Sequence, residues 1–305
     1  MNILITGANG FIGKSLTKAI LNRGDSVYAI VTNKDEMKDI ASPRLFVFEL
    51  FFENYDKIPE LVKEPIDIAY HFAWAGLCGA PAQDVKLQVS NIVATSTLIE
   101  GLAKLHTKKA VFASTMNTLE LRSLIANPTK VAPRGVSIHV SSKMNADIIA
   151  RTLCHKYGIM FNDGLIAMAY GENNKSKMIP NVIMYSLINN KEINLVEGNN
   201  PYDMVYVSDI VNAFIAIGEK GKNAQSYYIG HNDQRTFKDI ICAIRDILNK
   251  DQKLNFGVYK EDNCLDYSLI DRSLLTKDTG WKPEADFKES ILKTAKWIKG
   301  SGLEF

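Results

Sequence analysis

The stretch Thr6-Gly7-Ala8-Asn9-Gly10-Phe11-Ile12-Gly13 decides the fold. It ends an apolar run at residues 2–6, which predicts a short buried strand, and it opens a helical stretch from about Phe11 to Asn22. Gly7 permits a tight turn, Gly10 lets the backbone approach a diphosphate, and Gly13 allows the helix to pack closely on the strand. The free N–H groups of the helix start then face the anion. Strand, glycine turn and helix together predict a dinucleotide-binding site.

Further apolar runs rich in β-formers alternate with helix-like segments along the first half of the chain. They are Ser26–Val31, Leu45–Glu49, Ile66–Phe72 and Lys109–Ser114. This alternation predicts an α/β fold with a doubly wound parallel sheet covered on both faces. Beyond about residue 164 the pattern is less regular. We expect a dinucleotide-binding domain at residues 1–165, completed by about 203–230, and a smaller C-terminal α/β lobe for substrate from residues 166–202 and 231–305.

The composition excludes several classes of function. The chain has 305 residues, 46% of them apolar, and its 36 basic and 34 acidic residues form no long run of one sign. We therefore expect no nucleic-acid partner and no membrane partner. The four cysteines lie far apart and the histidines lack metal-ligand spacing, so free thiols, no protein-built metal site and a cytoplasmic location are expected.

The end of the second strand bears on the choice of dinucleotide. A carboxylate usually binds the adenosine ribose of NAD there, but this chain has no acid before Asp35. Thr32, Asn33 and Lys34 could receive the extra phosphate of NADP, with Lys34 as the point charge. We therefore expect NAD(P) with a preference for NADP; the alternative is that Lys34 is an ordinary solvated lysine.

Taken together, the motifs resemble the extended short-chain dehydrogenases, the family of nucleotide-sugar epimerases, dehydratases and reductases. Besides the glycine stretch, the resemblance rests on segments in the family's order and spacing. They are Glu49-Leu50, His71-Phe72-Ala73, Asn91, Asp203-Met204-Val205-Tyr206-Val207-Ser208-Asp209 and Thr279-Gly280-Trp281-Lys282-Pro283. The resemblance implies a Rossmann fold and hydride transfer between NAD(P) and a nucleotide-activated sugar.

The motifs and the resemblance together predict which residues contact the cofactor. They are Gly7, Asn9, Gly10, Phe11, Ile12, Gly13, Thr32, Asn33, Lys34, Glu49, Leu50, Phe72, Ala73, Trp74, Asn91, Lys143 and Ala169. The same resemblance places Thr115 at the strand end that supplies a catalytic Ser or Thr. It places His139-Val140-Ser141-Ser142-Lys143 over the family's Tyr-x-x-x-Lys.

His139 thus stands where the family has its proton-transferring tyrosine. An imidazole beside the Lys143 ammonium is expected to be neutral at pH 7, because a neighbouring positive charge disfavours its cation. A neutral imidazole can accept a proton from a sugar hydroxyl. One interpretation is that His139 replaces tyrosine as acid/base. The other is that hydride chemistry has weakened or moved to another group, such as Thr115 or a tyrosine elsewhere in the chain.

The substrate side departs from the family pattern as well. The family's phosphate-binding arginine is replaced by Tyr202, which has no charge, and Arg235 and Arg272 are the other candidates in the lobe. Trp74 could stack on a sugar or nicotinamide face. These departures motivate an alternative function, a catalytically altered or inactive dinucleotide-binding protein.

Within the enzymatic reading, the choice lies between an epimerase and a 4-keto reductase. Dehydratase activity is the weakest option, because Met116 and Asn117 follow Thr115 where that subclass carries Asp-Glu. The family commonly forms homodimers through two helices per subunit. Here those helices would lie around Gln83–Leu105 and His139–Lys156, although their apolar positions could equally cover the sheet.

Overall fold

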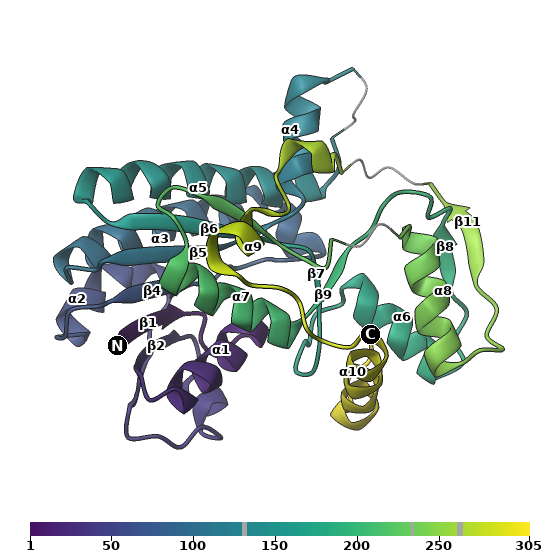
Figure 1. Ribbon diagram of the computed structural model, residues 1–305, viewed down its shortest axis with the longest axis horizontal. Coiled ribbons are helices and arrows are strands. Elements are labelled where there is room, and N and C mark those ends of the chain that lie inside the picture. Colours follow the sequence, from purple (N-terminus) through teal and green to yellow (C-terminus); the bar gives the residue numbers. More distant parts are fainter. Residues whose placement is uncertain (130–132, 233–234, 261–264) are drawn as a thin grey trace.

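The computed structural model describes residues 1–129, 133–232, 235–260 and 265–305. Its elements follow the alternation expected from the sequence (Figure 1). Cys78, Cys154 and Cys242 are free thiols, and Cys264 lies outside the described residues.

Seven parallel strands form the main sheet, in the order β10-β6-β5-β4-β1-β2-β3. Their bounds are β1 (Asn2–Thr6), β2 (Ser26–Val31), β3 (Leu45–Glu49), β4 (Ile68–His71), β5 (Lys109–Thr115), β6 (Met160–Ile166) and β10 (Ser226–Ile229). The order reverses between β1 and β4, and in open parallel sheets a ligand binds at such a point, beyond the carboxyl ends of the strands. The prediction of a doubly wound parallel sheet is confirmed.

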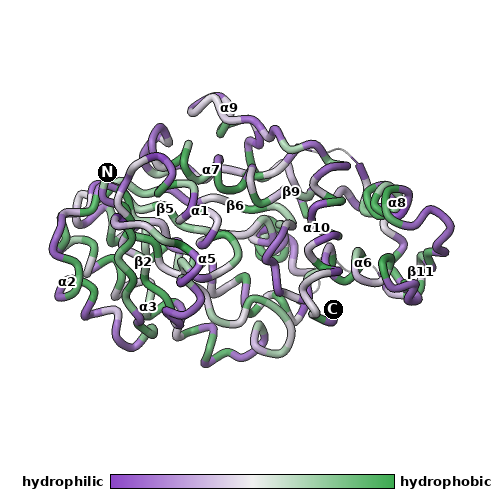
Figure 2. The backbone as a smooth tube through the Cα atoms, turned by 90° about the horizontal axis from the view of Figure 1, so that it is seen from below, coloured by the Kyte–Doolittle hydropathy of each residue, from purple (hydrophilic) through white to green (hydrophobic). Residues whose placement is uncertain are grey.

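Helices cover both faces of this sheet, and each face has its own apolar core. One face packs against α1 (Phe11–Asn22), α7 (Val207–Lys220) and α9 (Leu274–Thr279). The other packs against α2 (Ile58–Leu61), α3 (Val85–Lys104) and α5 (Val136–Tyr157). Most side chains of the central strands β1, β2 and β4 are apolar and buried (Figure 2), as expected for strands covered on both faces.

The bounds of β1, β2, β3 and α1 agree with the sequence prediction, but β4 is shorter than the expected Ile66–Phe72. The N–H of Ile66 donates to the carbonyl oxygen of Leu105, after the end of α3, and not to β1. The apolar run therefore extends beyond the strand ladder.

The C-terminal part contributes a lobe with a separate core (Figure 1). Two small parallel sheets pair β7 (Met168–Tyr170) with β9 (Met204–Tyr206) and β8 (Asn194–Val196) with β11 (Asn255–Tyr259). The lobe helices are α6 (Ile179–Ile188), α8 (Phe237–Leu248) and α10 (Phe287–Ser301). The domain boundary near residue 165 stays a prediction.

In the described residues, the connections contain one further α-helix and four short 3-10 helices. They are α4 (Thr118–Ala126), η1 (Lys34–Met37), η2 (Phe52–Lys57), η3 (Ala80–Gln83) and η4 (Tyr267–Leu269). Among the described helices, none is both long and apolar enough to cross a membrane.

Candidate active site

The glycine turn joins β1 to α1, and two of its glycines have no room for a side chain. Gly7 has φ +68°, and a Cβ there would lie 2.7 Å from the backbone nitrogen of Ala73. A Cβ on Gly13 would lie 2.2 Å from the carbonyl oxygen of Gly7. The start of α1 has no side-chain cap at Gly10 and no acidic residue in its first turn. Its unpaired N–H groups and positive helix end fit the diphosphate of a dinucleotide.

Lys143 lies on α5 and reaches the carboxyl end of β5. Its ammonium donates a hydrogen bond of 3.0 Å to the carbonyl oxygen of Ala113 and lies 4.0 Å from the centroid of the Trp74 ring. Burial of this enclosed ammonium lowers the pKa of Lys143 to about 7. Trp74, Ser114 and Lys143 line one small pocket at the ends of β4 and β5.

His139 lies one turn before Lys143 on the same helix. Only 5% of the residue's surface is exposed, and the ring meets Trp74 edge-on with centroids 5.7 Å apart. Burial, and secondarily the Lys143 charge, lowers the pKa of His139 to about 4. The imidazole is therefore neutral at pH 7, as expected from the sequence.

Thr115 ends β5 and begins the turn into α4. Its hydroxyl accepts a hydrogen bond of 3.3 Å from the N–H of Asn117, and its carbonyl oxygen accepts one of 2.9 Å from the hydroxyl of Thr118. Both bonds fix the turn. Thr115 and Ser114 thus occupy the strand end against which Lys143 is held.

A family model described as "NAD dependent epimerase/dehydratase family" matches residues 3–230. The chain belongs to this family. It is 23% identical to dTDP-glucose 4,6-dehydratase 1 of Escherichia coli, over 97% of this chain and 92% of that one.

Solved structures of family members have the same fold. UDP-glucose 4-epimerase of Thermotoga maritima, solved with UDP-glucose, has a TM-score of 0.80 at 19% identity and covers 99% of both chains. UDP-glucuronic acid 4-epimerase of Bacillus cereus, solved in complex with NAD, has a TM-score of 0.80 at 20% identity and also covers 99% of both chains.

In this epimerase/dehydratase family member, the segment after β2 contains charged side chains of both signs, Lys34 and Glu36. The Asn9 amide donates 2.7 Å to a carboxylate oxygen of Glu36 and 3.3 Å to the hydroxyl of Thr32. The backbone N–H of Lys34 donates 3.0 Å to the Glu49 carboxylate. In the described part of the chain, no ion pair involves the Lys34 ammonium. Glu36 thus stands between the glycine turn and the strand end, where a ribose carboxylate is usual.

Two other residues expected to contact the cofactor, Asn33 and Asn91, have local structural roles. The side chain of Asn33 accepts from the N–H of Asp35 and caps η1. Asn91, which is buried on α3, accepts 2.7 Å from the N–H of Ala75 and donates 3.1 Å to its carbonyl oxygen. Asn91 therefore holds the loop that follows β4, and direct contact with the cofactor stays a prediction.

Four other expected cofactor residues lie near the ends of strands. Leu50 is buried after β3, and Phe72 packs on Phe214 of α7 with ring centroids 4.7 Å apart. Ala73 donates 3.4 Å from its N–H to the hydroxyl of Thr6, and Ala169 lies in β7. Their contacts with cofactor also stay predictions.

The lobe residues expected to bind substrate lie against aromatic rings. Tyr202 is buried, packs edge-on against Phe237, and its hydroxyl has no hydrogen-bond partner in the described residues. Arg235 lies 4.8 Å from the Phe287 ring centroid, and Arg272 lies 4.9 Å from that of Tyr267. Tyr202 is part of the lobe core, so a substrate phosphate could reach its hydroxyl only if that core rearranged. The substrate roles of these three residues stay predictions.

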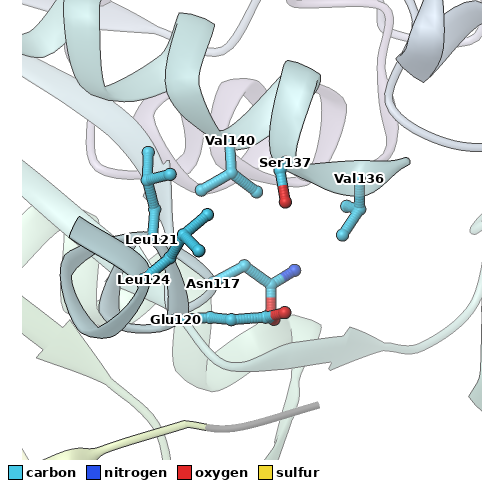
Figure 3. A pocket seen from close by; sticks show the side chains of 7 residues that line it. All are labelled: Asn117, Glu120, Leu121, Leu124, Val136, Ser137 and Val140. Carbon is cyan, nitrogen blue, oxygen red and sulfur yellow. The ribbon is translucent and has the colours of Figure 1, made fainter. Parts of the chain in front are cut away.

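A second small pocket lies between α4 and the start of α5 (Figure 3). Its lining residues are Asn117, Glu120, Leu121, Leu124, Val136, Ser137 and Val140. Arg134 binds the Glu120 carboxylate with two side-chain nitrogens, one of them at 2.6 Å. The ion pair fastens α4 to the chain entering α5, next to the turn that Thr115 begins.

Two residues that the sequence analysis did not identify also contact the site. Glu36 contacts the glycine turn, and Gln88 contacts both Trp74 and His139. An acid shortly after β2 was a usable signal for Glu36; no local pattern points to Gln88. Within the described ranges, no group of three or more His, Cys, Asp or Glu side chains is arranged to hold a metal ion.

Proposed function

We propose that this protein is an NAD(P)-dependent enzyme that transfers hydride at a carbon of a nucleotide-activated sugar, as an epimerase or 4-keto reductase. The observation that carries the proposal is the placement of Lys143 and His139, one turn apart on α5, with Lys143 held against the strand end that presents Thr115. Membership of the epimerase/dehydratase family supports it.

The bound nicotinamide would accept or return the hydride. The neutral His139 ring would take the proton of the sugar hydroxyl and later return it. Thr115 would hydrogen-bond the same oxygen. Lys143 would bind the nicotinamide ribose and disfavour a second positive charge nearby. Arg235, Arg272, Tyr202 and Trp74 remain the candidates for substrate contact.

A specific observation keeps the second candidate function open. The Trp74 ring lies over the Lys143 ammonium, and His139 is almost fully buried. A protein that binds a dinucleotide without turning over a sugar would tolerate both features.

One experiment separates the two functions. Purified protein is mixed with NAD or NADP, or their reduced forms, and a panel of UDP-, dTDP-, CDP- and GDP-sugars. Nicotinamide absorbance and sugar products are then followed. We expect a sugar nucleotide to be epimerised or its 4-keto form reduced. A dinucleotide that binds but is never oxidised or reduced, with no sugar product, would support the non-catalytic function.

The choice between NAD and NADP depends on two opposed charges. The NADP preference expected from Lys34 stays a prediction, and the Glu36 carboxylate opposes it by repelling a 2′-phosphate. We expect Glu36→Gln to shift the ratio of dissociation constants toward NADP, and Lys34→Gln to shift it toward NAD. Each shift should be about two- to fivefold, the scale of one exposed charge contact. Titration calorimetry with both dinucleotides measures the ratio.

Asp35→Asn is the matched control for both variants. Asp35 is the neighbouring exposed acid, and its carboxylate forms an ion pair with Lys38 at 2.8 Å. An equal ratio in the Glu36 variant and the wild type would remove Glu36 from cofactor selection.

We further propose a homodimer formed through α3 and α5. Val85, Val89 and Val93 are 57%, 48% and 58% exposed and recur every fourth residue on α3, and Ile148 of the adjacent α5 is 53% exposed. Such an apolar stripe on neighbouring helices fits a self-complementary interface.

The dimer gives a direct prediction. Val93→Glu should convert the protein to a monomer in sedimentation experiments, because a charge in the centre of an apolar interface is costly to bury. Ile125→Glu on α4, at an isoleucine that is 64% exposed, should leave the dimer intact. A monomeric wild type at micromolar concentration would contradict the proposal.

A further inference from the structure

Gln88 lies fully buried on α3, inside the loop that follows β4. Its amide nitrogen donates to three carbonyl oxygens of that loop, those of Ala75 at 3.2 Å, Gly76 at 2.8 Å and Pro81 at 3.1 Å. The loop wraps closely around the amide, because a Cβ on Gly76 would lie 2.7 Å from that nitrogen. Since carbonyl oxygens only accept, the three contacts fix which end of the amide is nitrogen.

The amide oxygen of Gln88 therefore faces two ring nitrogens. The Trp74 indole nitrogen lies 3.0 Å away and Nδ1 of His139 lies 3.2 Å away. The indole N–H can only donate, and the amide oxygen carries no hydrogen. The Nδ1 atom of His139 must then be the donor in its contact. In the neutral ring the single N–H is therefore at Nδ1, and the lone pair is at Nε2.

We propose that Gln88 is a positioning residue that holds His139 in the Nδ1–H tautomer and makes Nε2 the proton acceptor of the site. The part of this inference that concerns substrate rests on the proposed function. On oxidation of a sugar hydroxyl to a carbonyl, Nε2 would accept the hydroxyl proton, and a nicotinamide held by the glycine turn and Lys143 would supply the hydride acceptor. The Nδ1–H tautomer suits the oxidation half-reaction, in which the ring has to accept a proton at Nε2.

Trp74 strengthens this arrangement from the other side. It occupies the second acceptor position of the Gln88 oxygen and lies over Lys143 at 4.0 Å. Gln88 thus connects the loop after β4, the imidazole and, through the indole, the lysine. The described residues offer Nε2 of His139 no hydrogen-bond partner, which leaves its lone pair for a substrate hydroxyl.

The tautomer can be measured by nitrogen-15 NMR of the histidine side chains in the free protein at pH 7. His139→Gln assigns the signals. We expect a protonated Nδ1 and an unprotonated Nε2 for His139 in the wild type. In Gln88→Leu the acceptor is lost and the proton should move largely to Nε2. Gln88→Glu keeps an acceptor oxygen toward Nδ1, its other oxygen carrying a proton against the loop carbonyls, and should restore the Nδ1–H form.

His71 provides the internal control for folding. Its Nδ1 lies 2.6 Å from the hydroxyl of Thr6 and its Nε2 lies 3.2 Å from that of Thr95, so its signals report the sheet next to the site. A wild-type His139 protonated at Nε2 overturns the inference without any variant. So does an unchanged His139 tautomer in a Gln88→Leu protein whose His71 signals are native.

Kinetics separate the inference from the proposed function. On a sugar nucleotide that the wild type turns over, Gln88→Leu should lower kcat by about 10- to 100-fold with little change in KM, because an imidazole in the wrong tautomer cannot accept the proton. An unchanged kcat would remove the positioning role. A wild type that turns over none of the sugars, yet shows the Nδ1–H tautomer, would defeat the proposed function and leave the tautomer assignment standing.

Discussion

With alanine in place of His139, kcat for a sugar-nucleotide substrate is expected to fall by about 10²- to 10⁴-fold, the usual contribution of a positioned acid/base group. The dissociation constant of the dinucleotide should change little, because the imidazole contacts Gln88 and Trp74 and not the glycine turn. The loss should therefore appear in kcat and kcat/KM together, which marks an interaction made in the transition state. Steady-state kinetics and a separate titration of the dinucleotide measure both.

His155→Ala is the matched control. His155 lies on the same helix as His139, in its exposed last turn. Its removal should leave both constants unchanged. Unaltered turnover in His139→Ala would take the imidazole out of the mechanism and move proton transfer to another group.

The pH dependence has a definite direction. The pKa of His139, lowered to about 4 by burial, leaves the ring able to accept a proton at every pH above that value. We expect no loss of kcat/KM for hydroxyl oxidation between pH 5 and about 7 from this residue. The pKa of Lys143, lowered to about 7, predicts a decline above pH 7, as the ammonium that binds ribose loses its charge.

Much of the fold was predictable because its signals are local. The glycine turn, β2, β3 and α1 each depend on contiguous residues, and their bounds agree with the sequence. The expected strand at Ile66–Phe72 was too long at its start. Hydrophobicity does not distinguish a residue that is hydrogen-bonded within the sheet from one, such as Ile66, whose N–H bonds to Leu105 outside it.

The site was less predictable, because its chemistry depends on contacts between distant segments. Motif spacing placed His139 and Lys143 on one face of a helix. It could not show that Gln88, 51 positions before His139, fixes the ring's proton. Similarly, the contact between Asn9 and Glu36 exists only because the turn after β1 lies beside the end of β2. Contacts between side chains of different elements produce no periodic pattern in the sequence.

Lys143→Met is expected to abolish most dinucleotide binding while making the folded protein more stable at pH 7. The apolar side chain can keep its contact with the Trp74 ring but cannot hydrogen-bond a ribose hydroxyl. We expect the dissociation constant of the dinucleotide to rise by at least about tenfold, the effect of losing one charge-assisted hydrogen bond. Tryptophan fluorescence, to which Trp74 over the lysine contributes, offers one readout of binding and calorimetry another.

The stability effect follows from proton linkage. The lysine pKa is about 7 in the folded protein and 10.5 for a side chain exposed to water, so the unfolded chain binds more protons between these values. The free energy of unfolding of the wild type should then rise with pH from about 7 to 10.5. The methionine variant has no proton to lose, so this rise should disappear. At pH 7 we expect a gain of about 1–3 kcal/mol, less than the full desolvation cost because the carbonyl of Ala113 loses its donor.

Lys109→Met separates this effect from a general response to removing a buried lysine. Lys109 also lies on β5, at its first residue, and its ammonium donates to the carbonyl oxygens of Ile217 at 2.6 Å and Gly221 at 2.7 Å. Burial lowers the pKa of Lys109 to about 8. Lys109 and Thr115 are the first and last residues of β5, so Lys109 lies at the far end of the strand from the site. Denaturant unfolding across the pH range should show an altered slope for both variants, whereas dinucleotide binding should be lost only in Lys143→Met. Retained binding in that variant, together with a flattened stability profile, would mean that the buried ammonium serves the fold and not the cofactor.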